Sequence, residues 1–268
     1  MIKPYAMKQF VLMPVLALFF IATSCELAPE EVETTLLPLK ISMTLVQGSQ
    51  TSKILADFYY VDGTELIDHI TWSNHQTHFF EYDSQERLKV VRKMKVDVRV
   101  QEELWFVYDG ELVVRVDLVK RNLDYAYLEP VDSIYTGYVE YEYEGAYVIE
   151  ESEYEISEGG YREDYVRSVS YTYDSEGNVT AIDEMDPRSG ERNQISMTYD
   201  QSKHPYFALP YYFEGMSFVN NMLTRSEEES GLEYTYDLRL NEHEYPETVY
   251  EKLGSAYTRY ISYSYMQE

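Results

Sequence analysis

Apolar and polar residues alternate along most of the chain after residue 39. In the run VEYEYE at residues 139–144, valine and tyrosine alternate with glutamate, and rows with the same period occupy residues 165–173 and 257–265. A period of two places successive side chains on opposite faces of a β-strand. Turn signals such as Asp62-Gly63 and Gly177-Asn178 separate these rows. The pattern therefore predicts an all-β fold whose antiparallel strands follow one another in a meander.

The length of the alternating region sets the expected architecture. Residues 39–268 hold enough rows for roughly a dozen strands in a single domain. A flat layer of this size would leave much apolar surface in water, so we expect a strongly twisted or curled sheet, or a partly open barrel. Little helix is expected, because only residues 64–72 and 206–213 could each form a turn or short helix, and Pro210 limits the second.

The first 24 residues have the organisation of a signal peptide. Two lysines precede an apolar run at residues 10–22, and small residues then lead to Cys25, which is the only cysteine in the chain. The apolar run is too short for a transmembrane helix. This pattern resembles the lipobox of bacterial lipoproteins, which implies cleavage after residue 24 and lipidation of Cys25. The alternatives are a buried structural thiol or an ordinary secretory signal, and Met7 is a second candidate start.

Residues 25–38 are expected to form an acidic, flexible tether between the lipid and the domain. Residues 26–38 contain two prolines and four glutamates and show no period. Acidic residues after an acylated cysteine resemble the export signal of some Bacteroidetes-type lipoproteins. The resemblance implies a lipid-anchored outer-membrane protein exposed at the cell surface. The alternatives are the periplasmic leaflet and a plain polar spacer.

Charge and composition narrow the class of partner. The chain has a net charge of −26, which repels nucleic acid and anionic head groups, so no nucleic-acid partner is expected. The charge favours cationic partners or a divalent metal, and the alternative is a solvated acidic surface. The 29 tyrosines suit strands whose faces are partly wet, because the ring packs on neighbours while the hydroxyl reaches water. With its only cysteine acylated, the domain would depend on packing and strand pairing for stability.

A weak repeat begins at tyrosine-aspartate pairs. Its clearest copy covers residues 171–182. Other copies begin at Tyr82-Asp83, Tyr108-Asp109 and Tyr236-Asp237. At Asp174 we predict a hairpin turn in which the carboxylate accepts a hydrogen bond from the amide two residues later, while Gly177 supplies a positive φ. The tyrosines and the following aliphatic residues would then face each other across the two strands.

Two known families are similar to these residues. The Y-D-x-x-G-x-[LV] unit resembles the YD repeats of Rhs and teneurin-type proteins, whose hairpins form large β structures. Residues 135–268 more closely resemble the DUF4595-type domain of Bacteroidetes lipoproteins. The matching segments are Tyr199-Asp200, residues 203–206, residues 234–237 and the Y-x-Y pattern at 260–265. His204 and Tyr206 depart from the asparagine and phenylalanine usual there. The resemblance implies an outer-membrane-associated β domain and supplies no catalytic residues.

An acidic turn is the candidate calcium site. Asp174, Glu176 and Asn178 offer alternating oxygen ligands, but an EF-hand loop starting at Asp174 would need glutamate where Met185 stands. The alternative is a plain hairpin turn, and no cofactor other than calcium is expected.

Other chemical motifs are scarce. His69, His75 and His78 are close in sequence, but residues 75 and 78 point to opposite faces of a strand, so ordinary strand histidines are the favoured interpretation and no other metal site is expected. No Gly-x-Ser-x-Gly, P-loop, dinucleotide fingerprint or His-Glu-x-x-His motif occurs. We therefore expect no enzyme activity, and the remote alternative is a glycan-degrading enzyme that uses a carboxylate pair.

The sequence favours a membrane-anchored, non-catalytic binding module of the cell envelope, with a glycan or an envelope protein as ligand. Trp72 and Trp105 could form a platform for sugar rings. In the alternative, Trp105 packs within the core sheet and Trp72 caps its edge. A second class is a structural or adhesive assembly protein that pairs through open sheet edges.

Overall fold

The fold is described by a computed structural model for residues 36–47, 49–95, 100–123, 130–157, 162–204 and 220–266. These residues form sixteen β-strands. The strands are β1 (Pro38–Gln47), β2 (Gln50–Tyr60), β3 (Ile67–Trp72), β4 (Gln76–Tyr82), β5 (Leu88–Lys95), β6 (Val100–Asp109), β7 (Leu112–Leu123), β8 (Pro130–Glu144), β9 (Tyr147–Ile156), β10 (Glu163–Tyr173), β11 (Val179–Met185), β12 (Arg192–Lys203), β13 (Asn220–Glu227), β14 (Leu232–Leu240), β15 (Pro246–Leu253) and β16 (Ala256–Tyr265). Among the described residues, no helix is long and apolar enough to cross a membrane.

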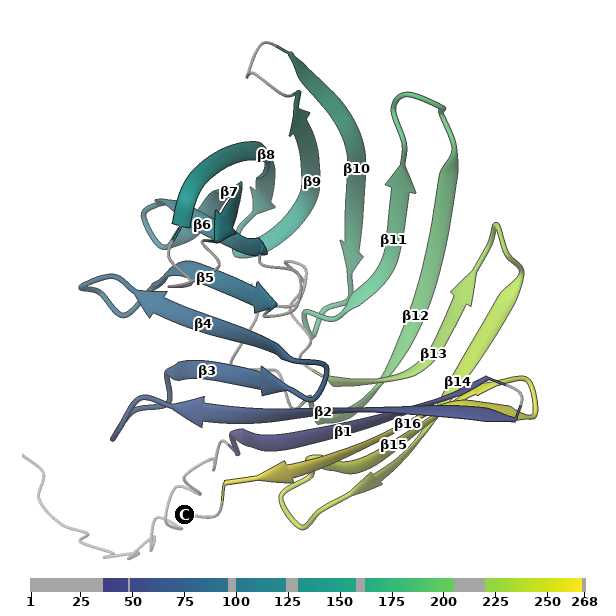
Figure 1. Ribbon diagram of the computed structural model, residues 1–268. Coiled ribbons are helices and arrows are strands. Elements are labelled where there is room, and N and C mark those ends of the chain that lie inside the picture. The colour runs from purple at the N-terminus through teal and green to yellow at the C-terminus, as the bar shows by residue number, and fades with distance from the viewer. Residues whose placement is uncertain are drawn as a thin grey trace, which may run out of the picture. The chain divides into compact units, whose positions relative to one another are not determined.

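The strands form a closed antiparallel barrel in chain order. Each strand pairs with its neighbours in sequence, and β1 lies beside β16 (Figure 1). In this closing pair Ile41 is opposite Tyr263. The predicted all-β antiparallel meander is confirmed, but the estimate of about a dozen strands and the partly open edge are wrong. Closure depends on pairing the two ends of the domain, which local periodicity does not reveal. Since the described strands leave no unpaired edge, assembly through an open sheet edge loses its basis.

All these pairings lie within one compact unit, Thr35–Glu268. Because this unit contains every strand of the barrel, we treat it as self-contained for folding. Leu36, Leu37 and Pro38, which the sequence analysis assigned to the tether, belong to it, and the two leucines are buried. Of the turn or short helix expected at residues 64–72, the helix is wrong, because Ile67–Trp72 is strand β3, while the chain turns just before it, where the Thr64 amide donates to Val61 O at 3.0 Å. The turn or short helix expected at residues 206–213 lies outside the described residues.

The inner face of the barrel is largely apolar. Tyr171, Ile182 and Ile195 are successive partners across β10, β11 and β12, so they share one face of the wall. Residues on this face from β10 through β16 line a common cavity, which identifies it as the inner face. Two buried clusters fill much of the interior. One is contributed mainly by β1 to β7, and the other by β9 to β12.

The outer face of the same wall is polar over large areas. Residues that oppose one another across neighbouring strands share a face, and on the outside they form rows of hydroxyl and charged side chains. These rows include Thr172 and Ser196; Thr198, Thr224, Thr235 and Lys252; and Ser42, Ser262 and Thr248. Outward ion pairs add to them, such as Lys40–Asp57 at 2.8 Å. The wall is therefore mainly apolar inside and rich in polar side chains outside.

Tyrosine hydroxyls tie adjacent strands together at one end of the barrel. In each case a tyrosine near the end of an even-numbered strand donates to a backbone carbonyl near the start of the preceding strand, with O···O distances between 2.6 and 3.0 Å. The pairs are Tyr60–Pro38, Tyr82–Ile67, Tyr108–Leu88, Tyr143–Val113, Tyr173–Val148, Tyr199–Val179 and Tyr265–Pro246. Burial raises the pKa of Tyr82 to about 12, so this phenol stays protonated and able to donate.

Three turns at this end share one hydrogen-bonding pattern. Oδ1 of Asp83, Asp174 or Asn241 accepts from the backbone amides two and four residues later, at 2.8 to 3.0 Å. The residue three positions later is left-handed in each turn: Glu86 (φ 62°), Gly177 (φ 93°) and Glu244 (φ 65°). The hairpin predicted at Asp174 is confirmed. The copy assigned to Tyr236-Asp237 is wrong, because Asp237 lies inside β14 and the turn occurs at Asn241.

Candidate functional site

A cavity of about 480 Å³ lies inside the barrel and is lined by residues of β10 to β16. Its apolar wall includes Val169, Ile182, Ile195, Met197, Leu238 and Ile261. Three arginines, Arg167, Arg225 and Arg259, and one glutamate, Glu184, are its charged lining residues in the described part of the chain. An apolar cavity with a few convergent polar groups is the usual form of a small-molecule site. This cavity is therefore the candidate functional site.

Two of the three cavity arginines are paired with a carboxylate at close range. Arg167 on β10 lies 2.5 Å from Glu184 on β11. Arg225 on β13 lies 2.7 Å from Glu227 on the same strand. Arg259 on β16 approaches Glu251 on β15 only to 3.7 Å, beyond the range of a normal hydrogen bond.

Glu251 is held by neutral donors rather than by Arg259. It is only 6% exposed, and it accepts from Thr258 Oγ1 at 2.8 Å and from the hydroxyl of Tyr236 at 3.2 Å. The Nε of Arg259 is buried and has no hydrogen-bond acceptor among the described residues. A buried donor without an acceptor is costly, so Arg259 marks the part of the cavity where an acceptor is missing.

The remaining titratable groups of the cavity are neutral at physiological pH. Burial raises the pKa of Tyr236, and the nearby Glu251 carboxylate raises it further, so the phenol keeps its proton. Burial lowers the pKa of His204 to about 3, so its imidazole adds no positive charge. The arginines therefore supply the positive charge of the cavity lining.

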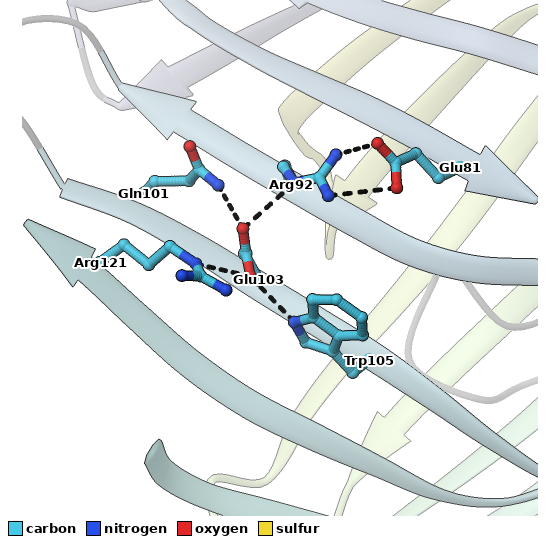
Figure 2. Close-up of polar contacts among 6 residues, drawn as sticks. All are labelled: Glu81, Arg92, Gln101, Glu103, Trp105 and Arg121. Carbon is cyan, nitrogen blue, oxygen red and sulfur yellow. Dashed lines mark hydrogen bonds and ion pairs between the residues drawn. The ribbon is translucent and has the colours of Figure 1, made fainter. Parts of the chain in front are cut away.

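A second polar cluster lies on the outer face of β4 to β7. Glu103 is 2% exposed, and it accepts from Trp105 Nε1 at 2.9 Å and from Arg92 Nε at 3.1 Å, while Arg121 Nε lies 2.9 Å away (Figure 2). Arg92 continues to Glu81 on β4. Burial opposes ionisation of Glu103, but hydrogen bonds from Arg121 and Trp105 and the charge of Arg121 outweigh it and hold its pKa below 4.5. We interpret this network as a brace between strands.

The two tryptophans do not form one platform. Trp72 lies opposite the buried Ala56, packs against the inner cluster, and donates from Nε1 to His78 at 3.3 Å. Trp105 is on the opposite face, next to the outer carboxylate of Glu103. The structure therefore corrects the predicted sugar platform: the wall of the barrel separates the two indoles. The alternative is also wrong in detail, since Trp72 contributes to the core and Trp105 does not.

The acidic turn at Asp174 is explained by hydrogen bonding within the protein. Asp174 Oδ1 accepts from two backbone amides, and its Oδ2 accepts from Asn178 Nδ2 at 3.1 Å. Asn178 is fully buried and also bonds Asn220, while Glu176 is exposed. These contacts are those of a plain hairpin turn, the alternative to a calcium site. Within the described residues, no group of three or more His, Cys, Asp or Glu side chains could hold a metal ion.

The three histidines are separated. His69 stacks on Tyr59 on the outer face with ring centroids 4.2 Å apart, His75 lies in the turn after β3, and His78 faces inward. Cys25 and the acidic residues that follow it lie outside the described residues.

The cavity arginines were not recognised from the sequence, although a signal was present. Arg167 alternates in phase with Val169 and Tyr171, and Arg259 alternates in phase with Ile261 and Tyr263. An arginine in the apolar phase of a strand points toward the core side of a sheet. The position of these arginines among the apolar residues of the alternation could therefore have identified them as cavity residues.

Comparison with known proteins gives a fold relationship. No protein-family profile matches the sequence, and no curated protein is significantly similar to it. A porin-like protein from Bacteroides vulgatus ATCC 8482 matches with a TM-score of 0.53 and 11% identity, over 87% of this chain and 100% of that one. A porin-like protein from Bacteroides uniformis ATCC 8492 has a TM-score of 0.43 and 11% identity, over 85% of this chain and 98% of that one. At this identity the first match supports a shared fold alone.

Proposed function

We propose that this chain is a lipid-anchored, non-catalytic binding protein of the bacterial outer membrane, and that its ligand occupies the cavity inside the barrel. Cys25 would carry the lipid, and the barrel would lie in water next to the membrane. The observation that carries the proposal is the polarity of the barrel wall, which carries rows of hydroxyl and charged side chains outside and is mainly apolar inside. The ligand is a small molecule or part of a glycan that can enter a cavity of about 480 Å³.

The porin-like description of the Bacteroides vulgatus structure raises the alternative of a membrane channel. Transmembrane barrels carry an apolar band outside and a polar lumen. Here the outward rows contain Thr198, Thr224 and Thr235, and the interior holds the two apolar clusters. Charged residues such as Lys40 and Asp57 also face outward. This arrangement favours a barrel in water that encloses a ligand.

The experiment that tests the proposal compares the wild-type protein with Cys25→Ser in a bacterial envelope. Wild type is expected to incorporate a fatty-acid label and to sediment with outer membranes. Cys25→Ser is expected to take up no label and to appear in the soluble fraction, because lipid anchoring is the proposed membrane attachment. Ser24→Ala is a matched control that changes the neighbouring small residue and should leave both properties intact.

The opposite fractionation would reject the proposal. If folded Cys25→Ser remained in the membrane and resisted extraction by alkaline carbonate, the barrel itself would be inserted in lipid. A surface-exposed location is tested separately by protease treatment of intact cells, which should degrade the protein.

A further inference from the structure

We infer that the barrel cavity binds an amphipathic carboxylate, with the carboxylate against Arg259 and the apolar part along the cavity wall. This inference rests on the proposed function, because it names the ligand class for the same cavity. The protein as a whole is strongly acidic. Among the described residues, however, three arginines line the cavity, and Arg259 is the one without a carboxylate at close range.

Arg259 supplies the first argument. Its Nε is buried and lacks a hydrogen-bond acceptor among the described residues, while its nearest carboxylate, on Glu251, is 3.7 Å away. Glu251 is already engaged by Thr258 and Tyr236. A ligand carboxylate at Arg259 would provide the missing acceptor, and arginine pairs with carboxylates through directed N–H donors.

Arg225 and Tyr236 lie near Arg259 in the cavity. Both arginines, Arg225 and Arg259, are close enough to influence ionisation of the Tyr236 phenol, and all three residues line the cavity. Tyr236 lies opposite Glu251, which in turn lies opposite Arg259, so the groups follow one another across β14, β15 and β16. Arg225 and Arg167 already have close carboxylate partners, Glu227 at 2.7 Å and Glu184 at 2.5 Å, so Arg259 is the cavity arginine left to bind the ligand.

The apolar wall defines the rest of the ligand. Leu238 lies opposite Val249, and Val249 lies opposite Ile261, so three aliphatic side chains form a continuous row next to the polar groups. Ile182, Ile195 and Met197 line the cavity from β11 and β12. A cavity of about 480 Å³ is within the usual range for small-molecule sites. A short acyl chain would bury its methylenes there and place its carboxylate at Arg259.

Calorimetric titration of the barrel unit, residues 35–268, with octanoate and octan-1-ol at pH 7.5 tests the inference. The two probes share their chain and differ in charge. We expect octanoate to bind at least tenfold more tightly than octan-1-ol. Arg259→Gln should lower the affinity for octanoate tenfold or more and leave that for octan-1-ol within twofold. Arg259→Lys keeps the charge but lacks Nε, and it should show an intermediate loss.

The controls separate the possible failures. Arg239→Gln removes an exposed arginine on the outer side of β14, which pairs with Glu247 at 3.4 Å, and should change neither affinity. Thermal unfolding confirms that each variant is folded. If Arg259→Gln does not fold, the affinity of Arg259→Lys for octanoate tests the role of Arg259. Equal binding of both probes, unaffected by the Arg259 variants, would overturn the carboxylate site and leave the binding cavity intact. Absence of binding by either probe to folded wild type would overturn both.

Discussion

The hydroxyl of Tyr173 donates a 2.7 Å hydrogen bond to the backbone carbonyl of Val148, joining the end of β10 to the start of β9. Six other tyrosines in the described part of the chain make the same contact between paired strands. These bonds explain why tyrosine rather than phenylalanine occupies these positions. The rings of all but Tyr265 pack against the inner clusters, while each hydroxyl satisfies a carbonyl at the end of the barrel.

The first prediction concerns this contact. Tyr173→Phe keeps the ring and removes the donor, so it should lower the free energy of unfolding by about 1 kcal/mol. Chemical denaturation of the barrel unit measures this loss. Tyr59→Phe is the matched control, because Tyr59 is 47% exposed and its ring remains stacked on His69. An equal effect of the two substitutions would show that the hydroxyl of Tyr173 has no special role.

The second prediction concerns the close approach of β8 and β9. A Cβ added to Gly137 would lie 2.1 Å from the carbonyl oxygen of Tyr154, and the obstacle is backbone. Gly137→Ala should therefore cost about 3 kcal/mol of unfolding free energy. Gly145→Ala, in the β8–β9 turn at φ +65° with open space around it, should cost only about 1 kcal/mol. If both variants unfold at the same denaturant concentration, the strands are not packed this closely.

The third prediction concerns the pH dependence of the network around Glu103. Because its pKa is lower in the folded protein than its usual value of 4.5, ionised Glu103 stabilises the fold above that pH, and this contribution is lost as pH falls through the folded-state pKa. Wild type should thus be more stable than Glu103→Gln at pH 7. The difference should shrink below about pH 4.5, as measured by denaturation across pH.

The comparison at low pH separates the effect of the Glu103 charge from the general loss of stability in acid. Asp83 and Asp174 also have lowered pKa values, Asp83 mainly through its hydrogen bond with Arg87, so the whole protein loses stability in acid. Comparing wild type with Glu103→Gln cancels these shared losses. A difference that stays constant from pH 7 to pH 3 would mean that the charge of Glu103 does not stabilise the barrel.

The fourth prediction places the ligand inside the barrel. Leu238→Trp adds an indole to the cavity, which should abolish octanoate binding and change stability by no more than about 2 kcal/mol, because space is available. Thr235→Trp adds the same group to the outer face of the same strand, where residue 235 is exposed, and should leave binding unchanged. Loss of binding in Thr235→Trp alone would place the ligand on the outer surface.

The sequence predicted the local structure well because local structure depends on short-range patterns. The period of two identified the strands, and the aspartate and glycine of the Asp174 turn act as expected. Barrel closure was missed because it depends on β1 pairing with β16, and nothing near either strand in sequence specifies the other.

The candidate site was harder to predict because it depends on which face each side chain occupies. Trp72 faces inward because it lies opposite the buried Ala56. Trp105 faces outward because it follows the inward Leu104 and lies opposite Asp117. Arg225 and Arg259 come together with Tyr236 only after β13 to β16 are in register. Such information requires strand pairing, which alternation within a single strand does not contain.

The most direct test of the central claim, that the outer wall faces water while a lipid holds the protein at the membrane, is the accessibility of a spin label at Ser170. This residue is exposed, and it lies on the outer face of β10 opposite Asp183. Since Cys25 is the only native cysteine and is proposed to be acylated, Ser170→Cys provides a single reactive thiol. In liposomes containing the anchored protein, we predict more frequent collisions of the label with a water-soluble nickel chelate than with oxygen. The reverse order would place this face in lipid and contradict the account.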